Sequence, residues 1–134
     1  MHKLKLKLEL KWLQPYLEAV EHLIRMDKIS EIRLIKYGTA LPSYHGLIEK
    51  VSNYRKYRIT LRVYDNAENR FPISPLDQEN ILNTLAHELA HVGPHDDWLD
   101  DYTVERFVLE TKIYRIFGNV LKKLNYEKER NKVK

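Results

Sequence analysis

The chain has 134 residues, of which 43% are hydrophobic and 31% charged, with a formal net charge of +4 at pH 7. This composition excludes a disordered chain and fits one domain over residues 1–134. Because cysteine is absent, any transition metal must bind imidazole and carboxylate groups. There is no apolar run of about 18 residues and no apolar stretch typical of a secretory signal, so we expect a cytoplasmic protein without a membrane span.

The excess of basic residues is divided between the two ends of the chain, within residues 3–11 and 122–134. Between these ends the sequence carries Asp96, Asp97, Asp100 and Asp101. A nucleic-acid-binding face would be contiguous and free of such acids, so the charge pattern does not favour nucleic acid as a partner.

Hydrophobic periodicity predicts four strands and one helix in the first half of the chain. Residues 3–11 (KLKLKLELK) alternate strictly between leucine and charged residues, which is typical of a half-buried strand. Pro15 then suits the first turn of a helix. Residues 31–38 (EIRLIKYG) predict a second strand, and residues 47–51 and 57–64 predict a hairpin.

Two helices are expected in the second half. Ser74 is a suitable N-cap and Pro75 a first-turn residue for a helix that stops at Gly93. The last helix is predicted from about Thr103 to Leu124, and we expect residues 126–134 to form a flexible or cleft-binding tail. The predicted fold class is α+β, with a small twisted sheet of three to four strands packed on an N-terminal helix and two C-terminal helices.

The end of the first of these two helices lies within NTLAHELAHVGPHDDW, residues 83–98. Positions i and i+4 of a helix lie one above the other, about 6 Å apart along the axis, so His87 and His91 can direct ring nitrogens at one metal ion. Glu88 lies one residue around the helix, where its carboxylate can reach a metal-bound water. The pattern therefore predicts a divalent metal site with Glu88 as general base.

A third ligand has to come from later in the chain. His95 continues the four-residue spacing, but on an unbroken helix it would lie about 6 Å beyond His91. The last helix carries a predicted apolar stripe of Phe107, Tyr114, Phe117 and Leu121. Glu110 points into that stripe, whereas Glu105 points roughly 140° away. Because a buried carboxylate is costly unless it is paired or metal-bound, this geometry favours Glu110, with His95 as the alternative.

HELAH followed by eighteen residues and Glu110 resembles the HExxH-x18-E signature of gluzincin metallopeptidases. The resemblance implies a zinc-dependent peptidase in which His87, His91 and Glu110 bind zinc and Glu88 activates the water that hydrolyses the peptide bond. The small size and the order of elements are similar to those of minimal single-domain gluzincins. They imply a zincin-like fold and a peptide or protein substrate.

The sequence departs from this family in two respects. Its length leads us to expect no counterpart of the second domain that forms the far wall of the cleft in full-size gluzincins. Leu109 and Thr111 also flank Glu110, where some members have an acidic or asparagine neighbour. With the cleft open, the tail could block it and produce a latent, self-inhibited enzyme.

Two other interpretations remain open. Residues 93–96 (GPHD) resemble SprT-like and WLM proteases, which would imply action on DNA-bound proteins with His95 as ligand, although the spacing after the second histidine is shorter here. The second is a non-catalytic, metal-stabilised binding module. Zincins commonly bind substrate as an added strand, which would make residues 57–65 the rim strand, although an inner strand is equally compatible.

Overall fold

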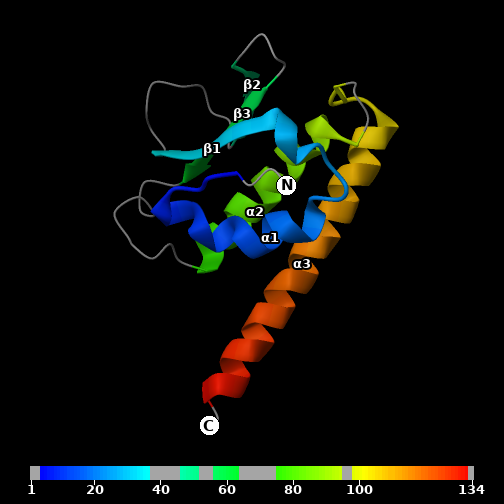
Figure 1. Ribbon diagram of the computed structural model, residues 1–134. Coiled ribbons are helices and arrows are strands. Elements are labelled where there is room, and N and C mark those ends of the chain that lie inside the picture. Colours follow the sequence, from blue (N-terminus) through cyan, green and yellow to red (C-terminus); the bar gives the residue numbers. More distant parts are fainter. Residues whose placement is uncertain (1–3, 37–45, 52–55, 64–74, 95–97, 133–134) are drawn as a thin grey trace.

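A three-stranded sheet and three α-helices form the described part of the chain in the computed structural model (Figure 1). The architecture is α+β, as predicted. The structure describes residues 4–36, 46–51, 56–63, 75–94 and 98–132.

The sheet consists of β1 (Ile29–Lys36), β2 (Gly46–Lys50) and β3 (Tyr57–Val63), in the order β1-β3-β2. β3 pairs in parallel with β1 and antiparallel with β2. The predicted hairpin and the predicted strand before it are therefore confirmed. Because β3 is the central strand, the inner-strand alternative for these residues is confirmed and the rim-strand alternative is wrong; β2 is instead an edge among the described strands.

Alternation along the central strand explains how the sheet joins the core. Ile59 and Leu61 of β3 share one face and are completely buried. On β2, Glu49 pairs in register with Arg58, and their side chains form an ion pair with an N–O distance of 2.9 Å. One face of the sheet thus packs on the helices, while Arg58 of β3 and Glu49 of β2 pair on the opposite face.

Helices α1 (Gln14–Val20) and α2 (Pro75–Leu89) lie beneath the sheet in Figure 1. α2 continues into the short 3-10 helix η3 (Ala90–Val92). Another 3-10 turn, η2 (Met26–Lys28), leads into β1. The core between these elements includes the buried side chains Tyr16, Leu17, Val20, Ile81, Leu82, Leu85, Ala86 and Leu89.

The leucine-rich N-terminal segment is not a strand, so that prediction is wrong. Residues Leu8–Leu13 form the 3-10 helix η1. Leu10 and Leu13 are fully buried three residues apart, as on one side of a helical turn, whereas Leu8 is 70% exposed. Burial at a spacing of three therefore overrides the alternation of residues 3–11.

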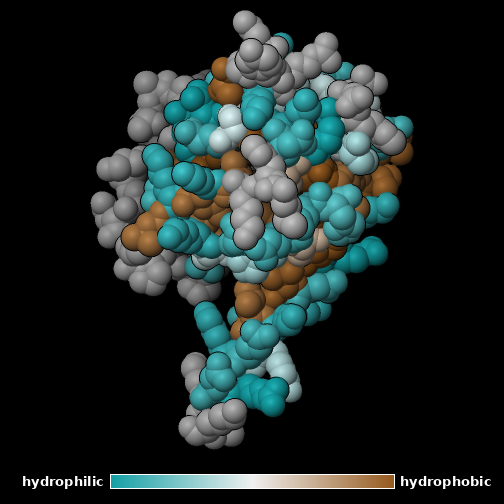
Figure 2. Space-filling view, in the orientation of Figure 1, coloured by the Kyte–Doolittle hydropathy of each residue, from teal (hydrophilic) through white to brown (hydrophobic). Residues whose placement is uncertain are grey.

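α3 extends from Val104 to Lys132, beyond the predicted end at Leu124, and projects past the rest of the molecule (Figure 1). Residues 126–132, for which we expected a tail, are the last turns of this helix. At 1.5 Å per residue, Lys132 lies about 30 Å along the axis from Glu110. Hydrophobic surface follows the middle of α3 in Figure 2 and gives way to hydrophilic surface near its end. No helix in the described part is long and apolar enough to cross a membrane.

The buried face of α3 also differs from the predicted stripe. Leu109, Ile113 and Phe117 are buried, whereas Phe107 and Tyr114 are 64% and 53% exposed. The predicted stripe is therefore wrong for Phe107 and Tyr114. The helix is rotated so that Leu109 and Ile113 meet the core, and Glu110 lies beside this face with its side chain about one quarter exposed.

Gly46 is the first residue of β2 and packs directly against α2. A Cβ at this position would collide with the methyl group of Thr84 and lie 3.5 Å from Glu88 Cγ. Substitution by alanine must therefore push the edge of the sheet away from the helix.

We expect Gly46→Ala to lower the free energy of unfolding by about 1–3 kcal/mol, the usual cost of overpacking. Gly118→Ala is the matched control, because no heavy atom lies within 4 Å of its Cβ position. In the interior of α3 the control should stabilise the protein by about 0.5–1 kcal/mol. Urea unfolding of both variants tests this, and equal shifts would contradict it.

Candidate metal centre

The candidate centre lies where α2 ends and α3 begins. Leu85, Ala86 and Leu89 of α2 are buried in the core. His87 and His91 lie on another side of the helix and face residues that precede or begin α3. The 3-10 helix η3 ends before Gly93, and the Leu99 N–H donates to the His91 carbonyl oxygen at 3.1 Å, which holds Leu99 beside His91.

His91 has acceptors at both ring nitrogens. Its Nδ1 lies 2.6 Å from the Leu99 carbonyl oxygen, and its Nε2 lies 3.0 Å from Asp101 Oδ1. Trp98 stacks on the imidazole with 4.6 Å between ring centroids, and Tyr57 of β3 contacts the same indole. Burial lowers the pKa of His91, against the opposing effects of the Leu99 hydrogen bond and Asp101, and thus favours the neutral ring.

His87 is held in the same manner, although its side chain is 42% exposed. Its Nδ1 lies 2.8 Å from Glu110 Oε1, and its Nε2 lies 3.7 Å from Asp101 Oδ1. The two imidazoles are therefore arranged alike, each with Nδ1 against an acceptor outside the centre and Nε2 toward Asp101.

These contacts determine which ring nitrogens are available to a metal. A backbone carbonyl and a carboxylate can only accept, so both Nδ1 atoms are assigned as the N–H donors. In neutral rings, both Nε2 atoms then present lone pairs toward the Asp101 carboxylate. The two Nε2 lone pairs and the carboxylate repel one another unless a cation lies between them. In the described part of the chain, His87, His91 and Asp101 offer ligand atoms within 4.8 Å of one another and could hold a metal ion.

Glu88 is the buried acid of the centre, with 7% of its surface exposed. Burial raises the pKa of Glu88 to about 7. Asp101 and Glu110 add to this rise in the pKa, while His87 and Arg106 oppose it. A carboxylate in this environment can both accept and return a proton near neutral pH.

Arg106, also buried, connects the two helices. Its NH1 group donates to the His87 carbonyl oxygen at 3.1 Å, and its NH2 group donates to Glu110 Oε2 at 3.3 Å. The Nε atom has no hydrogen-bond partner and lies 3.8 Å from Asp101 Oδ1. NH1 also lies 3.4 Å from His87 Nδ1, but two donors cannot bond, so the carbonyl is its acceptor.

The predicted site residues His87, Glu88 and His91 lie together in the structure. Glu110 contacts Nδ1 of His87, whereas the other ring nitrogen, Nε2, faces Asp101. Glu105 is exposed on α3. His95 lies outside the described residues.

Asp101 and Arg106 were missed as individual site residues. Asp101 was only one of four aspartates in a polar run. The four-residue spacing of Arg106 and Glu110 is the one signal that could have indicated their pairing.

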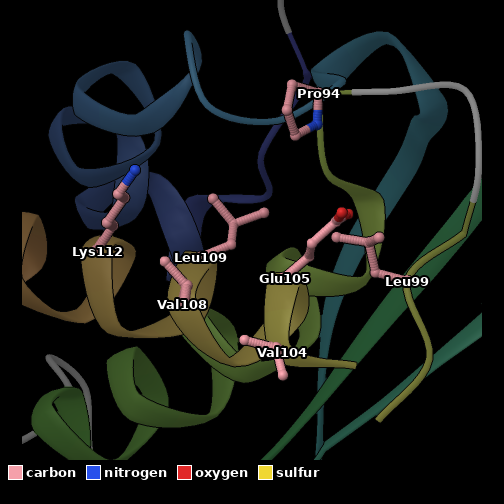
Figure 3. Close-up of a pocket in the computed structure, with 7 residues that line it drawn as sticks. All are labelled: Pro94, Leu99, Val104, Glu105, Val108, Leu109 and Lys112. Carbon is pink, nitrogen blue, oxygen red and sulfur yellow. The ribbon is translucent and has the colours of Figure 1, made fainter. Parts of the chain in front are cut away.

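A separate pocket of about 300 Å³ lies beside the centre, on another face of α3 (Figure 3). It is lined by Pro94, Leu99, Val104, Glu105, Val108, Leu109 and Lys112. Leu99 belongs to both places, because its carbonyl oxygen accepts from His91 while its side chain lines the pocket.

Comparison of the chain with protein-family models, curated proteins and solved structures finds no match. The resemblance to gluzincins therefore rests on the motif and its spacing alone.

We expect Arg106→Ala to lower the free energy of unfolding by about 1–3 kcal/mol in the presence of a chelator, because charge-assisted hydrogen bonds to Glu110 and to the His87 carbonyl are lost. Arg115→Ala, an exposed arginine on the same helix, should change stability by less than about 0.5 kcal/mol. Urea unfolding provides the measurement. Similar effects of the two substitutions would show that the Arg106 contacts contribute little.

Proposed function

We propose that the protein is a zinc-dependent peptidase of the zincin type. The observation that carries this proposal is the convergence of two histidine Nε2 atoms on one carboxylate oxygen, with Glu88 beside them on the same helix. The HExxH motif and the α+β arrangement, with the motif on a helix beneath a small sheet, support the same conclusion.

The donor set fits a zinc ion, because two neutral imidazoles and a carboxylate are common ligands of catalytic zinc. Bound there, zinc would act as a Lewis acid that polarises the scissile carbonyl and acidifies water. Asp101 is more than half exposed at its side chain, so the centre is open to solvent on that side.

Glu88 carries the proton transfer in this proposal. Its carboxylate accepts a proton as water attacks the carbonyl carbon and returns that proton to the leaving amine. Without a metal the pKa of Glu88 is raised to about 7, and a cation bound beside it would favour the ionised carboxylate. His87 and Arg106 oppose the rise in pKa, and they thus favour the ionised carboxylate that the first step requires.

The position of β2 supports a peptide as the substrate. Gly46, at the start of β2, lies against Glu88, with 3.5 Å between its Cβ position and Glu88 Oε1. β2 has a pairing strand on only one side within the described residues. An extended peptide could therefore pair with β2 and pass close to Glu88.

The direct test compares Glu88→Gln with the wild type. Glutamine keeps the shape of the side chain but cannot accept the proton. We therefore expect unchanged zinc stoichiometry and a fall of about 10²–10⁴-fold in the hydrolysis of a quenched-fluorescent peptide library. Glu105→Gln is the control, because Glu105 is exposed on α3 and outside the metal group.

Two outcomes of this comparison would contradict the proposal. Wild-type protein that takes up zinc yet cleaves no peptide would favour the non-catalytic binding module. Equal rates for the wild type and Glu88→Gln would remove Glu88 from the reaction.

A further inference from the structure

We propose that Asp101 supplies the third protein ligand of the metal, and that Glu110, anchored by Arg106, is a positioning residue that orients His87. The inference rests on the proposed function and deepens it. It reverses the roles that the eighteen-residue spacing to Glu110 implies for these two acids.

The distances from Asp101 to the two histidines match those between ligands of one metal ion. Ligand bonds of about 2.0–2.1 Å at a tetrahedral ion separate two ligand atoms by about 3.3 Å. Asp101 Oδ1 lies 3.0 Å from His91 Nε2 and 3.7 Å from His87 Nε2, on either side of that value. The Asp101 carboxylate therefore already stands at ligand spacing from both imidazoles.

The turn before α3 keeps Asp101 in this place. The Thr103 N–H and hydroxyl both donate to the Asp100 carbonyl oxygen, at 3.1 and 2.9 Å. Thr103 Oγ1 also accepts from the Arg106 N–H at the start of α3. Asp101 is thus presented by a hydrogen-bonded turn that the helix itself anchors.

Glu110 has both carboxylate oxygens engaged away from the Nε2 atoms. Oε1 accepts from His87 Nδ1 at 2.8 Å, and Oε2 accepts from Arg106 at 3.3 Å. To become a ligand, Glu110 would have to break both contacts. In its present position it fixes the His87 tautomer with the Nε2 lone pair free and makes that nitrogen a stronger donor to a metal.

Arg106 completes the arrangement through charge and position. Its guanidinium lies between the two acids, bonded to Glu110 and 3.8 Å from Asp101. It offsets the repulsion between these carboxylates, and its bond to the His87 carbonyl oxygen ties α3 to the end of α2. The cation therefore holds Glu110 behind the histidine and leaves Asp101 free to face the metal.

The experiment titrates Co²⁺ into wild type, Asp101→Asn, Glu110→Gln and Asp100→Asn proteins, since cobalt accepts the same ligands and reports them by its visible absorption. Competition with a chelator gives the affinity of each. We expect Glu110→Gln to weaken binding by about 10–100-fold while the spectrum at saturation stays that of the wild type. Asp101→Asn should weaken binding more and change the spectrum. Asp100→Asn, the exposed neighbour, should do neither.

The reverse pattern, with an altered spectrum for Glu110→Gln and an unaltered one for Asp101→Asn, would overturn the inference and leave the proposed peptidase intact. Wild-type affinity and spectrum in both variants would also overturn it. If the wild type itself bound no cobalt, the proposed function would fail instead.

Discussion

The centre depends on two imidazoles that share one hydrogen-bonding constraint. Each Nδ1 faces a group that can only accept, the Leu99 carbonyl for His91 and the Glu110 carboxylate for His87. Both rings must therefore turn Nε2 toward Asp101. When both rings are neutral and Asp101 is ionised, no donor lies between these three groups, and a metal cation would satisfy all of them at once.

The surroundings of the imidazoles make this constraint rigid. Trp98 stacks on His91, and Tyr57 of the central strand contacts Trp98, so the ring is connected to the sheet. Arg106 ties α3 to the last turn of α2 through the His87 carbonyl. Both histidines are thus held from elements far apart in the sequence, which reduces the entropy lost when a ligand binds.

The charge around the two Nε2 atoms also favours a divalent cation. Asp101 and Glu110 both raise the pKa of Glu88, and Arg106, which pairs with Glu110, opposes this rise. Two ionised acids and one arginine leave a net negative charge around the Nε2 atoms even when Glu88 is protonated. That field attracts a divalent cation and repels anions.

The motif helix and the hairpin could be predicted from sequence because their signals are local. The HELAH spacing places His87 and His91 on one side of any helix. The alternation of residues 57–63 predicts a strand, which pairs with residues 46–50 in the structure. The alternating N-terminal leucines gave a wrong strand prediction, because the same segment can also form a 3-10 turn that buries Leu10 and Leu13.

The relation between Asp101 and Glu110 could not be predicted in this way. Glu110 was singled out by its distance along the chain and by a stripe that included Phe107. In the structure α3 is rotated relative to the predicted orientation, so that Leu109 and Ile113 pack in the core. Glu110 then contacts His87 Nδ1. Asp101 depends on the turn that ends at Thr103, a conformation that hydrophobic periodicity does not encode. Packing and turn geometry, both non-periodic, therefore decide which acid faces the two Nε2 atoms.

Anomalous diffraction at the zinc edge, from crystals grown with one equivalent of zinc, would locate the metal directly. We expect one peak within about 2.0–2.2 Å of Nε2 of both His87 and His91. A zinc peak elsewhere in the crystal, with none between these two nitrogen atoms, would contradict it.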